Sequence, residues 1–156
     1  MCEYCGCRQI EPLAELMDEH LRLLDEAGEV RRAVSVRDPE RATTLLRSLG
    51  AHLDRHVRRE EDGVFAALRR SGEYLDELAE LEQEHRDFHD QIDSLDPTDP
   101  SFAERFAQIF AHLTDHIDKE DLGIFPVSVV TLGTEGWDLV ARVHGAEPSF
   151  LHDQGS

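Results

Sequence analysis

The sequence has few of the residues that mark several classes of protein. Aromatic residues make up only 6% of the 156 residues, and its three cysteines are Cys2, Cys5 and Cys7. An odd number of cysteines gathered at one end does not make a disulfide scaffold. The Cys-x-x-Cys-x-Cys stretch lacks a fourth ligand for a soft metal. We therefore expect residues 1–9 to form a thiol-bearing tail without a defined structural role, with metal capture or thiol switching as the alternative.

Long apolar runs are also missing. No stretch approaches the roughly 20 apolar residues that span a bilayer. The N-terminus has no basic start followed by an apolar segment, as a secretory signal would have. We therefore expect a cytoplasmic protein without a membrane partner. At 156 residues the chain can bury the core of one domain.

Basic residues are scarce as well. The chain has 16 lysines and arginines against 34 aspartates and glutamates, which gives a formal net charge of −18. Such a charge argues against nucleic acid and against anionic membranes as partners, because like charges repel. Acidity suits a cation-binding protein, although most of the acidic side chains are expected to form a solvated surface.

Turn-forming residues mark the boundaries between helices. Asp38-Pro39 and Asp99-Pro100 each place a good N-cap residue before a proline at the first helical position. Ser71-Gly72 marks another break, and no strand-like alternation occurs. The sequence predicts five helices, at residues 10–36, 39–70, 73–95, 100–131 and, for the short last one, 134–145.

Short connections between these helices make neighbours antiparallel. We therefore predict an all-α protein with an up-down-up-down antiparallel four-helix bundle over residues 10–131. A short C-terminal fifth helix and tail follow over residues 132–156.

Two phrases of the sequence occur twice. Residues 51–65 read AHLDRHVRREEDGVF and residues 111–125 read AHLTDHIDKEDLGIF, while LAELMDEH at 13–20 returns as LAELEQEH at 78–85. Both phrases keep their order, so the simplest interpretation is a duplicated helical hairpin. A pseudo-twofold axis between the two hairpins would bring their histidines and carboxylates face to face.

The apolar stripe of each long helix contains ionisable side chains. One such histidine is usually a hydrogen-bonded core residue, but burying several imidazoles and carboxylates together is costly unless they are paired or bind a metal. Residues four apart lie on the same helix face, so each His-x-x-x-Glu or His-x-x-x-His pair can face one cavity. The candidate ligands are His20, His56, Glu60, His85, His89, His116 and Glu120.

This ligand set consists of nitrogen and oxygen donors. One tetrahedral zinc ion needs four ligands and often uses sulfur. Seven nitrogen and oxygen ligands instead suit two borderline-hard ions such as iron, with the carboxylates bridging them.

The order of the motifs resembles that of the hemerythrin-like (HHE cation-binding) family. The pattern of that family is H, HxxxE, HxxxH and then HxxxE or HxxxxD on four antiparallel helices. The similarity covers roughly residues 13–126 and includes the Ile-Phe-Pro at 124–126.

The resemblance implies a non-haem di-iron centre with a bridging oxo or hydroxo group. The implied ligands are His85, His89 and His116 for one iron and His20 and His56 for the other. Glu60 and a carboxylate of the fourth helix would bridge the two. The second iron would keep an open position for O₂, peroxide, azide or NO. The internal repeat agrees, because Leu24 in the first half aligns with His89 in the second.

The identity of the second bridging carboxylate is open between two neighbours. Oxygen carriers of the family place it five residues after the histidine, at Asp121 here. Helix geometry and the repeat favour Glu120, because position i+5 points about 140° away from position i. A bulge caused by Pro126 would bring Asp121 inward. Glu120 is the prediction and Asp121 the alternative, while Glu61 and Asp62 are expected to be solvated.

His52 and His112 each lie one turn before a predicted ligand. They are either boundary histidines hydrogen-bonded to a neighbouring helix or groups that orient a ligand and move protons.

The predicted centre is expected to bind or react with O₂, peroxide or NO. Three uses fit it: reversible binding, turnover by an enzyme of peroxidase, catalase or NO-oxidising type, and iron buffering or sensing. The sequence identifies neither a protein partner nor an oligomeric state.

Overall fold

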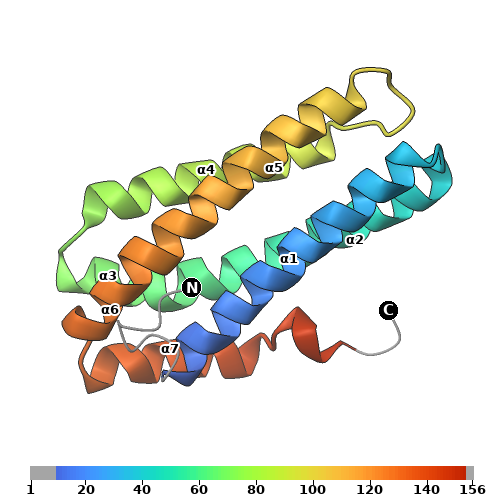
Figure 1. Ribbon diagram of the computed structural model, residues 1–156. Coiled ribbons are helices and arrows are strands. Elements are labelled where there is room, and N and C mark those ends of the chain that lie inside the picture. The colour runs from blue at the N-terminus through green and yellow to red at the C-terminus, as the bar shows by residue number, and fades with distance from the viewer. Residues whose placement is uncertain (1–9, 154–156) are drawn as a thin grey trace.

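The structure, a computed structural model, describes residues 10–153, and these residues are helical apart from short connections (Figure 1). The predicted cysteine-containing tail lies outside this range. Residues 10–153 contain no strand, so the prediction of an all-α protein is confirmed. The elements are α1 (Glu11–Ser35), α2 (Pro39–Glu60), η2 (Glu61–Phe65), α3 (Ala66–Ser71), α4 (Leu75–Asp93), α5 (Phe102–Lys119), η3 (Glu120–Ile124), α6 (Phe125–Thr131), α7 (Thr134–Ala146) and η4 (Phe150–His152).

The predicted helix boundaries are confirmed at one aspartate-proline pair and shifted at the other. Asp38 caps α2 by accepting a hydrogen bond from the backbone N–H of Arg41, and Pro39 occupies the first turn. The helix predicted to start at residue 100 begins at Phe102. Asp99 does not cap it, because its carboxylate accepts hydrogen bonds from the backbone N–H and the hydroxyl of Ser101. The Asp99 side chain thus closes a turn before the helix.

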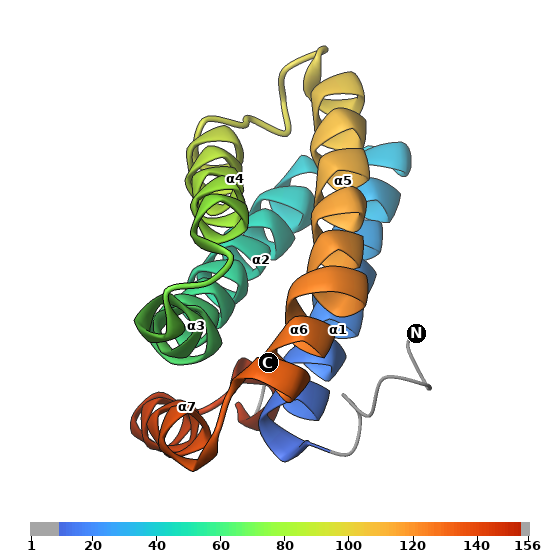
Figure 2. The ribbon, with the colours of Figure 1, turned by 90° about the vertical axis from the view of Figure 1, so that its left-hand side faces the viewer.

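The four long helical segments lie side by side around a common interior (Figure 2). α1 packs against α2 and α5, α2 packs against α4, and α4 packs against α5. This ring of contacts is consistent with the predicted bundle. Across residues 10–153, no helix combines the length and the hydropathy that a bilayer-spanning segment needs.

The buried apolar side chains form two clusters along the helices. One cluster contains Leu23, Leu53, Phe88 and Leu113 and reaches the end where α1 joins α2. The other contains Leu16, Val64, Leu81 and Ile124 and lies toward α7. Along every long segment a buried histidine falls between members of the two clusters. The core is therefore divided by a polar layer.

Both copies of the repeated phrase contain a π-helical turn. η2 follows α2 and η3 follows α5, one residue earlier in the register of the repeat. Pro126 comes after η3, but Ala66 stands at the matching position after η2. A proline is therefore not needed for the widened turn, and the cause that we expected for a bulge in the second copy does not apply to the first.

The short fifth helix packs across the end of the other helices. α7 contacts η2, α3 and α1, and η4 continues onto α1 and α2 (Figure 1). Val140 of α7 is fully buried, while Trp137 and Leu139 are partly buried against the second apolar cluster. Among the described residues, the C-terminal helix thus covers one side of the first helical hairpin.

Gly72 ends α3 with a backbone φ of +80°, a conformation that strains residues with a Cβ. We expect Gly72→Ala to lower the free energy of unfolding by about 1 kcal/mol. Gly28→Ala, inside α1, is the matched control and should raise it by about 0.5–1 kcal/mol, since its Cβ would meet only the flexible end of Arg32. Urea unfolding measures both, and an equal effect of the two substitutions would contradict this account.

Candidate metal centre

Six side chains converge in the polar layer between the two apolar clusters. They are His20 of α1, His56 and Glu60 of α2, His85 of α4, His116 of α5 and Glu120 of η3. All six are buried, and both glutamates have no exposed surface. They form two overlapping groups that share the two glutamates, and within each group the potential ligand atoms lie within 4.8 Å of one another.

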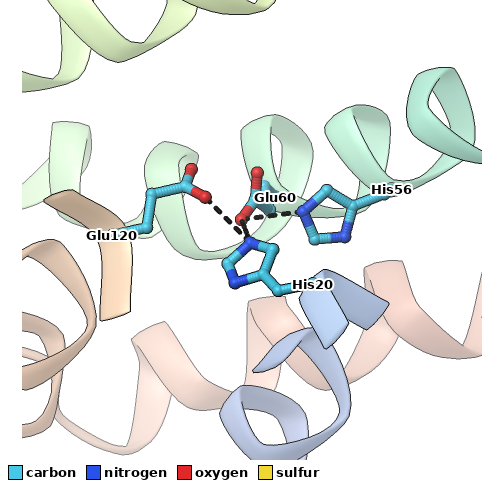
Figure 3. Close-up of side chains that lie close together, drawn as sticks. All are labelled: His20, His56, Glu60 and Glu120. Carbon is cyan, nitrogen blue, oxygen red and sulfur yellow. Dashed lines mark ion pairs between the residues drawn. The ribbon is translucent and has the colours of Figure 1, made fainter. Parts of the chain in front are cut away.

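The first group joins the imidazoles of α1 and α2 to both carboxylates (Figure 3). The Nε2 atom of His20 lies 2.9 Å from Glu120 Oε1 and 3.3 Å from Glu60 Oε2. The Nε2 atom of His56 lies 3.2 Å from the same oxygen of Glu60. The two rings approach edge to face, with centroids 4.7 Å apart. Nε2 is therefore the ring nitrogen that both imidazoles direct toward the carboxylates.

The second group repeats this arrangement with the imidazoles of α4 and α5. The Nε2 atom of His85 lies 3.3 Å from Glu60 Oε1 and 3.5 Å from Glu120 Oε2. The Nε2 atom of His116 lies 3.3 Å from Glu120 Oε2 and 3.0 Å from Nε2 of His85. Each glutamate therefore presents one oxygen to each group, as a bridging carboxylate would.

The other ring nitrogen of every histidine faces a carboxylate outside the centre. Within the first hairpin, Nδ1 of His56 lies 2.8 Å from Glu19 Oε1. Within the second, Nδ1 of His116 lies 2.7 Å from Glu84 Oε1. Glu19 and Glu84 are equivalent in the repeat, since each directly precedes a histidine of the centre. Such a pairing fixes the tautomer and orientation of an imidazole that points at a metal.

The remaining two histidines pair with carboxylates of the opposite hairpin. Nδ1 of His20 lies 2.8 Å from Asp121 Oδ1, and Nδ1 of His85 lies 2.7 Å from Glu61 Oε2. Both acids lie in a π-helical turn, directly after a central glutamate. The expectation that Glu61 is solvated was wrong, because its carboxylate is only 29% exposed and binds an imidazole.

The structure distinguishes the two candidates for the second bridging carboxylate by position. Glu120 lies in the centre with both oxygens facing imidazoles, whereas Asp121 lies behind the ring of His20. The π-helical turn is present, but it begins at Glu120 and leaves that side chain facing inward. The ligand position predicted from helix spacing and from the repeat is therefore the one that Glu120 occupies.

His89 does not lie in the centre, which corrects the predicted set of seven. Its side chain is 55% exposed, and its Nδ1 lies 3.0 Å from Asp54 Oδ1 on α2. The inward position of this turn belongs to Phe88, which is buried and packs its ring edge against His116 at 5.3 Å. The same four-residue step keeps Glu60 and Glu120 inward after His56 and His116, so His89 lies outside because Phe88 holds the inward position on α4. Each group in the centre consequently has two histidines.

The two histidines expected near the centre do not contact it. Nδ1 of His52 lies 2.7 Å from Glu26 Oε1, and its ring stacks on Phe150 of η4 at 4.5 Å. His112 is exposed at the rim of a surface cavity of about 250 Å³. His52 therefore matches the first of our two interpretations, a boundary histidine bonded to a neighbouring helix.

Burial and charge act in opposite directions on the acid–base groups of the centre. Burial would lower the pKa of His20 and His85, but the facing carboxylates outweigh it and raise the pKa of both well above 6.5. For Glu60, burial and the nearby Glu120 would raise the pKa, yet the imidazoles hold it at about 2. The pKa of Glu120 is also held well below its ordinary value, by His116 first among the imidazoles. The centre therefore contains ionised carboxylates that need positive charge beside them.

Several buried polar atoms of the centre lack a hydrogen-bond partner, and a bound cation would satisfy them. All four oxygens of Glu60 and Glu120, and Nε2 of His20, are buried without a hydrogen-bond partner. If each Nδ1 donates its proton to the outer carboxylate, each Nε2 turns a lone pair inward. Lone pairs of imidazoles and carboxylates then converge with no donor between them. Nitrogen and oxygen donors of this kind suit iron and related first-row cations.

Sequence reasoning missed the groups that hold the outer carboxylates. Nε of Arg59, which is fully buried, lies 3.2 Å from Glu19 Oε2. At the matching place, Nζ of Lys119 lies 2.7 Å from Glu84 Oε2. A signal was available, because the acid before the first histidine and the cation before the central glutamate both recur in the repeat.

A buried set of imidazoles and carboxylates inside an all-helical fold defines a helical cation-binding protein. Comparison with models of known families matches residues 11–128 to the hemerythrin HHE cation binding domain. The chain therefore belongs to the hemerythrin HHE cation-binding family, and the resemblance seen in the sequence is confirmed. Searches of curated proteins and of solved structures each returned no match.

The metal-free protein is expected to lose stability as the pH rises above about 6.5. The folded-state pKa of His20 and His85 lies above 6.5, so their stabilising protonation is complete below that pH and is lost as the pH passes the raised values. Thermal unfolding of chelator-treated protein measures this. Metal-loaded protein is the control and should not show the loss, because cations replace the protons. A melting temperature of the metal-free form that rises with pH would contradict the assignment.

Proposed function

We propose that this chain binds two iron ions in the polar layer of an antiparallel four-helix bundle. The observation that carries the proposal is the convergence of four imidazoles on two buried carboxylates whose four oxygens have no hydrogen-bond partner. Membership of a cation-binding family supports it independently. The proposal includes the bridging oxo or hydroxo group between the ions that the family resemblance implies.

The chain supplies equal ligand sets to the two ions in this proposal. His20 and His56 would hold one ion, His85 and His116 the other, and Glu60 and Glu120 would span both. The distances of each carboxylate to both pairs of imidazoles support this division. The division into three and two histidines that the resemblance implied does not fit, because His89 lies at the surface.

The outer carboxylates and the apolar clusters prepare the site for the ions. The four acids behind the imidazoles hold Nε2 inward and increase the basicity of each ring. The apolar clusters above and below exclude water from the layer, which strengthens the attraction between the carboxylates and a cation. When bound, the ions would supply redox and Lewis-acid chemistry that the side chains lack.

We further propose that O₂, peroxide or NO binds or reacts at this centre. Two imidazoles and two shared carboxylates leave positions on each ion that the protein does not fill. Reversible binding at one open position was the expectation from the resemblance. Equal ligand sets instead favour a second candidate, repeated turnover of peroxide or NO, because both ions would be open to the ligand. Iron buffering is the remaining alternative.

The placement of His89 gives a direct test of the ligand set. We expect His89→Ala to retain about two irons per chain, as the unsubstituted protein does, because His89 faces solvent. His85→Ala should retain about one or fewer, since it removes an inner ligand. Metal analysis of purified protein measures the content, and circular dichroism confirms that both variants are folded. Equal iron loss in the two variants would contradict the proposed set.

Small-ligand chemistry is tested on the iron-loaded protein. Azide or peroxide is expected to change its absorption spectrum, because each ion keeps positions without a protein ligand. Glu60→Ala, which removes a shared carboxylate, is the control and should show no such change. Consumption of many peroxide molecules per centre would support turnover, whereas a spectrum that reverses when the ligand is removed would support a binding protein. An unchanged spectrum in fully loaded protein would exclude both.

A further inference from the structure

The centre has two halves, the first with His20 and His56 and the second with His85 and His116. Their ligands match in the repeat. The outer networks, meaning the ion pairs of the acids behind the histidines, match as well. In the first half, Arg59 bonds to Glu19 and also to Glu15 one turn earlier. In the second half, Lys119 bonds to Glu84 and also to Glu80 one turn earlier. The positions correspond throughout the repeat. Any difference between the two halves must therefore come from what covers these networks.

The network of the first half is sealed by the C-terminal part of the chain. Arg59 has no exposed surface, because its guanidinium donates to the backbone carbonyls of His144 and Glu147 at the end of α7. Glu19 is fully buried as well. His144 packs against Gly63 of η2, where an added Cβ would lie 3.5 Å from its ring. Solvent thus has no direct approach to the carboxylate behind His56.

Residues 147–153, which we call the C-terminal segment, are held on α2 by further arginines. Arg55 donates to the carbonyl of Pro148 and pairs with Asp153 at 2.9 Å, and Arg58 pairs with Glu147 at 2.7 Å. The positions equivalent to Arg55 and Arg58 in the second half are Asp115 and Asp118. Both positions thus carry a negatively charged side chain in the second half and a positively charged one in the first. The second half therefore lacks the groups that bind the C-terminal segment to the first.

The network of the second half is open to solvent. The side chain of Lys119 is 39% exposed and that of Glu84 is 26% exposed. In Figure 1, α4 and α5 lie on the side of the molecule away from α7. On this side a cavity of about 250 Å³ is lined by Glu84, Asp87, Phe88, Gln91, His112 and Asp115. Glu84 and Phe88 both contact the ring of His116, so the cavity ends directly behind a ligand of the centre.

We propose that cations enter and leave the centre through its His85–His116 half, past Glu84, while the C-terminal segment locks the His20–His56 half. The acids around the cavity attract a divalent cation, and Glu84 is partly exposed where its counterpart Glu19 is fully buried. Lys119 and Arg59 are positioning residues that act through Glu84 and Glu19. This inference rests on the proposed function, because it assigns different exchange behaviour to its two ions.

Release of iron to a chelator tests the assignment. The full chain is loaded anaerobically with Fe(II) and mixed with excess ferrous chelator, and the coloured complex is followed over time. We expect two phases of equal amplitude. His116→Gln should abolish the fast phase and His56→Gln the slow phase, because each removes an imidazole from one half.

A matched pair of positioning variants separates the two networks. Lys119→Met should accelerate the fast phase by about tenfold and leave the slow phase unchanged, and Arg59→Met should do the reverse. Arg59 is buried, so its replacement risks unfolding the protein. Arg55→Ala, which releases the C-terminal segment without touching Glu19, provides the second variant and should also accelerate the slow phase alone.

The outcomes distinguish this inference from the function on which it rests. A chain that holds fewer than two irons would overturn both. Two irons that leave at a single rate would overturn only the inference, as would phases assigned in the opposite order by the His116→Gln and His56→Gln variants. An Arg55→Ala protein with both phases unchanged would overturn the locking role of the C-terminal segment.

Discussion

Electrostatic balance in one buried layer is the constraint on which the rest of the structure depends. Four imidazole nitrogens and the oxygens of Glu60 and Glu120 face one another in a space that solvent does not reach. Glu60, with a pKa of about 2, and Glu120, whose pKa is held well below its ordinary value, cannot relieve the charge by taking up protons at neutral pH. Positive charge must come from imidazolium ions or from bound cations, and the cost of supplying neither is prohibitive.

The same constraint explains the ring of acids behind the histidines. An imidazole whose Nδ1 donates to a carboxylate has its Nε2 free to act as a ligand, and its plane is fixed by that bond. Glu19 and Glu84 hold the histidines of α2 and α5, while Glu61 and Asp121 reach across to α4 and α1. The last two come from π-helical turns. In each copy a central glutamate is thus followed directly by an acid that lies behind a histidine of the other hairpin.

Periodicity predicted most of the fold and most of the centre because both depend on helix geometry. The helices begin and end within two residues of their predicted limits. The predicted cap at Asp99 was wrong, because a side chain that closes a turn and one that caps a helix look alike in sequence. His89 was misplaced for a related reason. His85 can pair with residues three or four positions later, and packing against His116 selected Phe88 for the interior. Sequence spacing alone does not predict whether Phe88 or His89 faces the interior.

The outer networks show how a duplicated hairpin acquires two different halves. The ligand positions carry the same residue types in both copies, which keeps the ligand sets equal. The copies differ at the surface, where Arg55 and Arg58 face the C-terminal segment and Asp115 and Asp118 face solvent. Surface substitutions leave the buried charge balance untouched, whereas any change of an inner ligand would disturb it. Differences outside the ligand set can therefore make the two halves of a symmetric centre behave differently. The coverage of the first half by α7 and the C-terminal segment is such a difference.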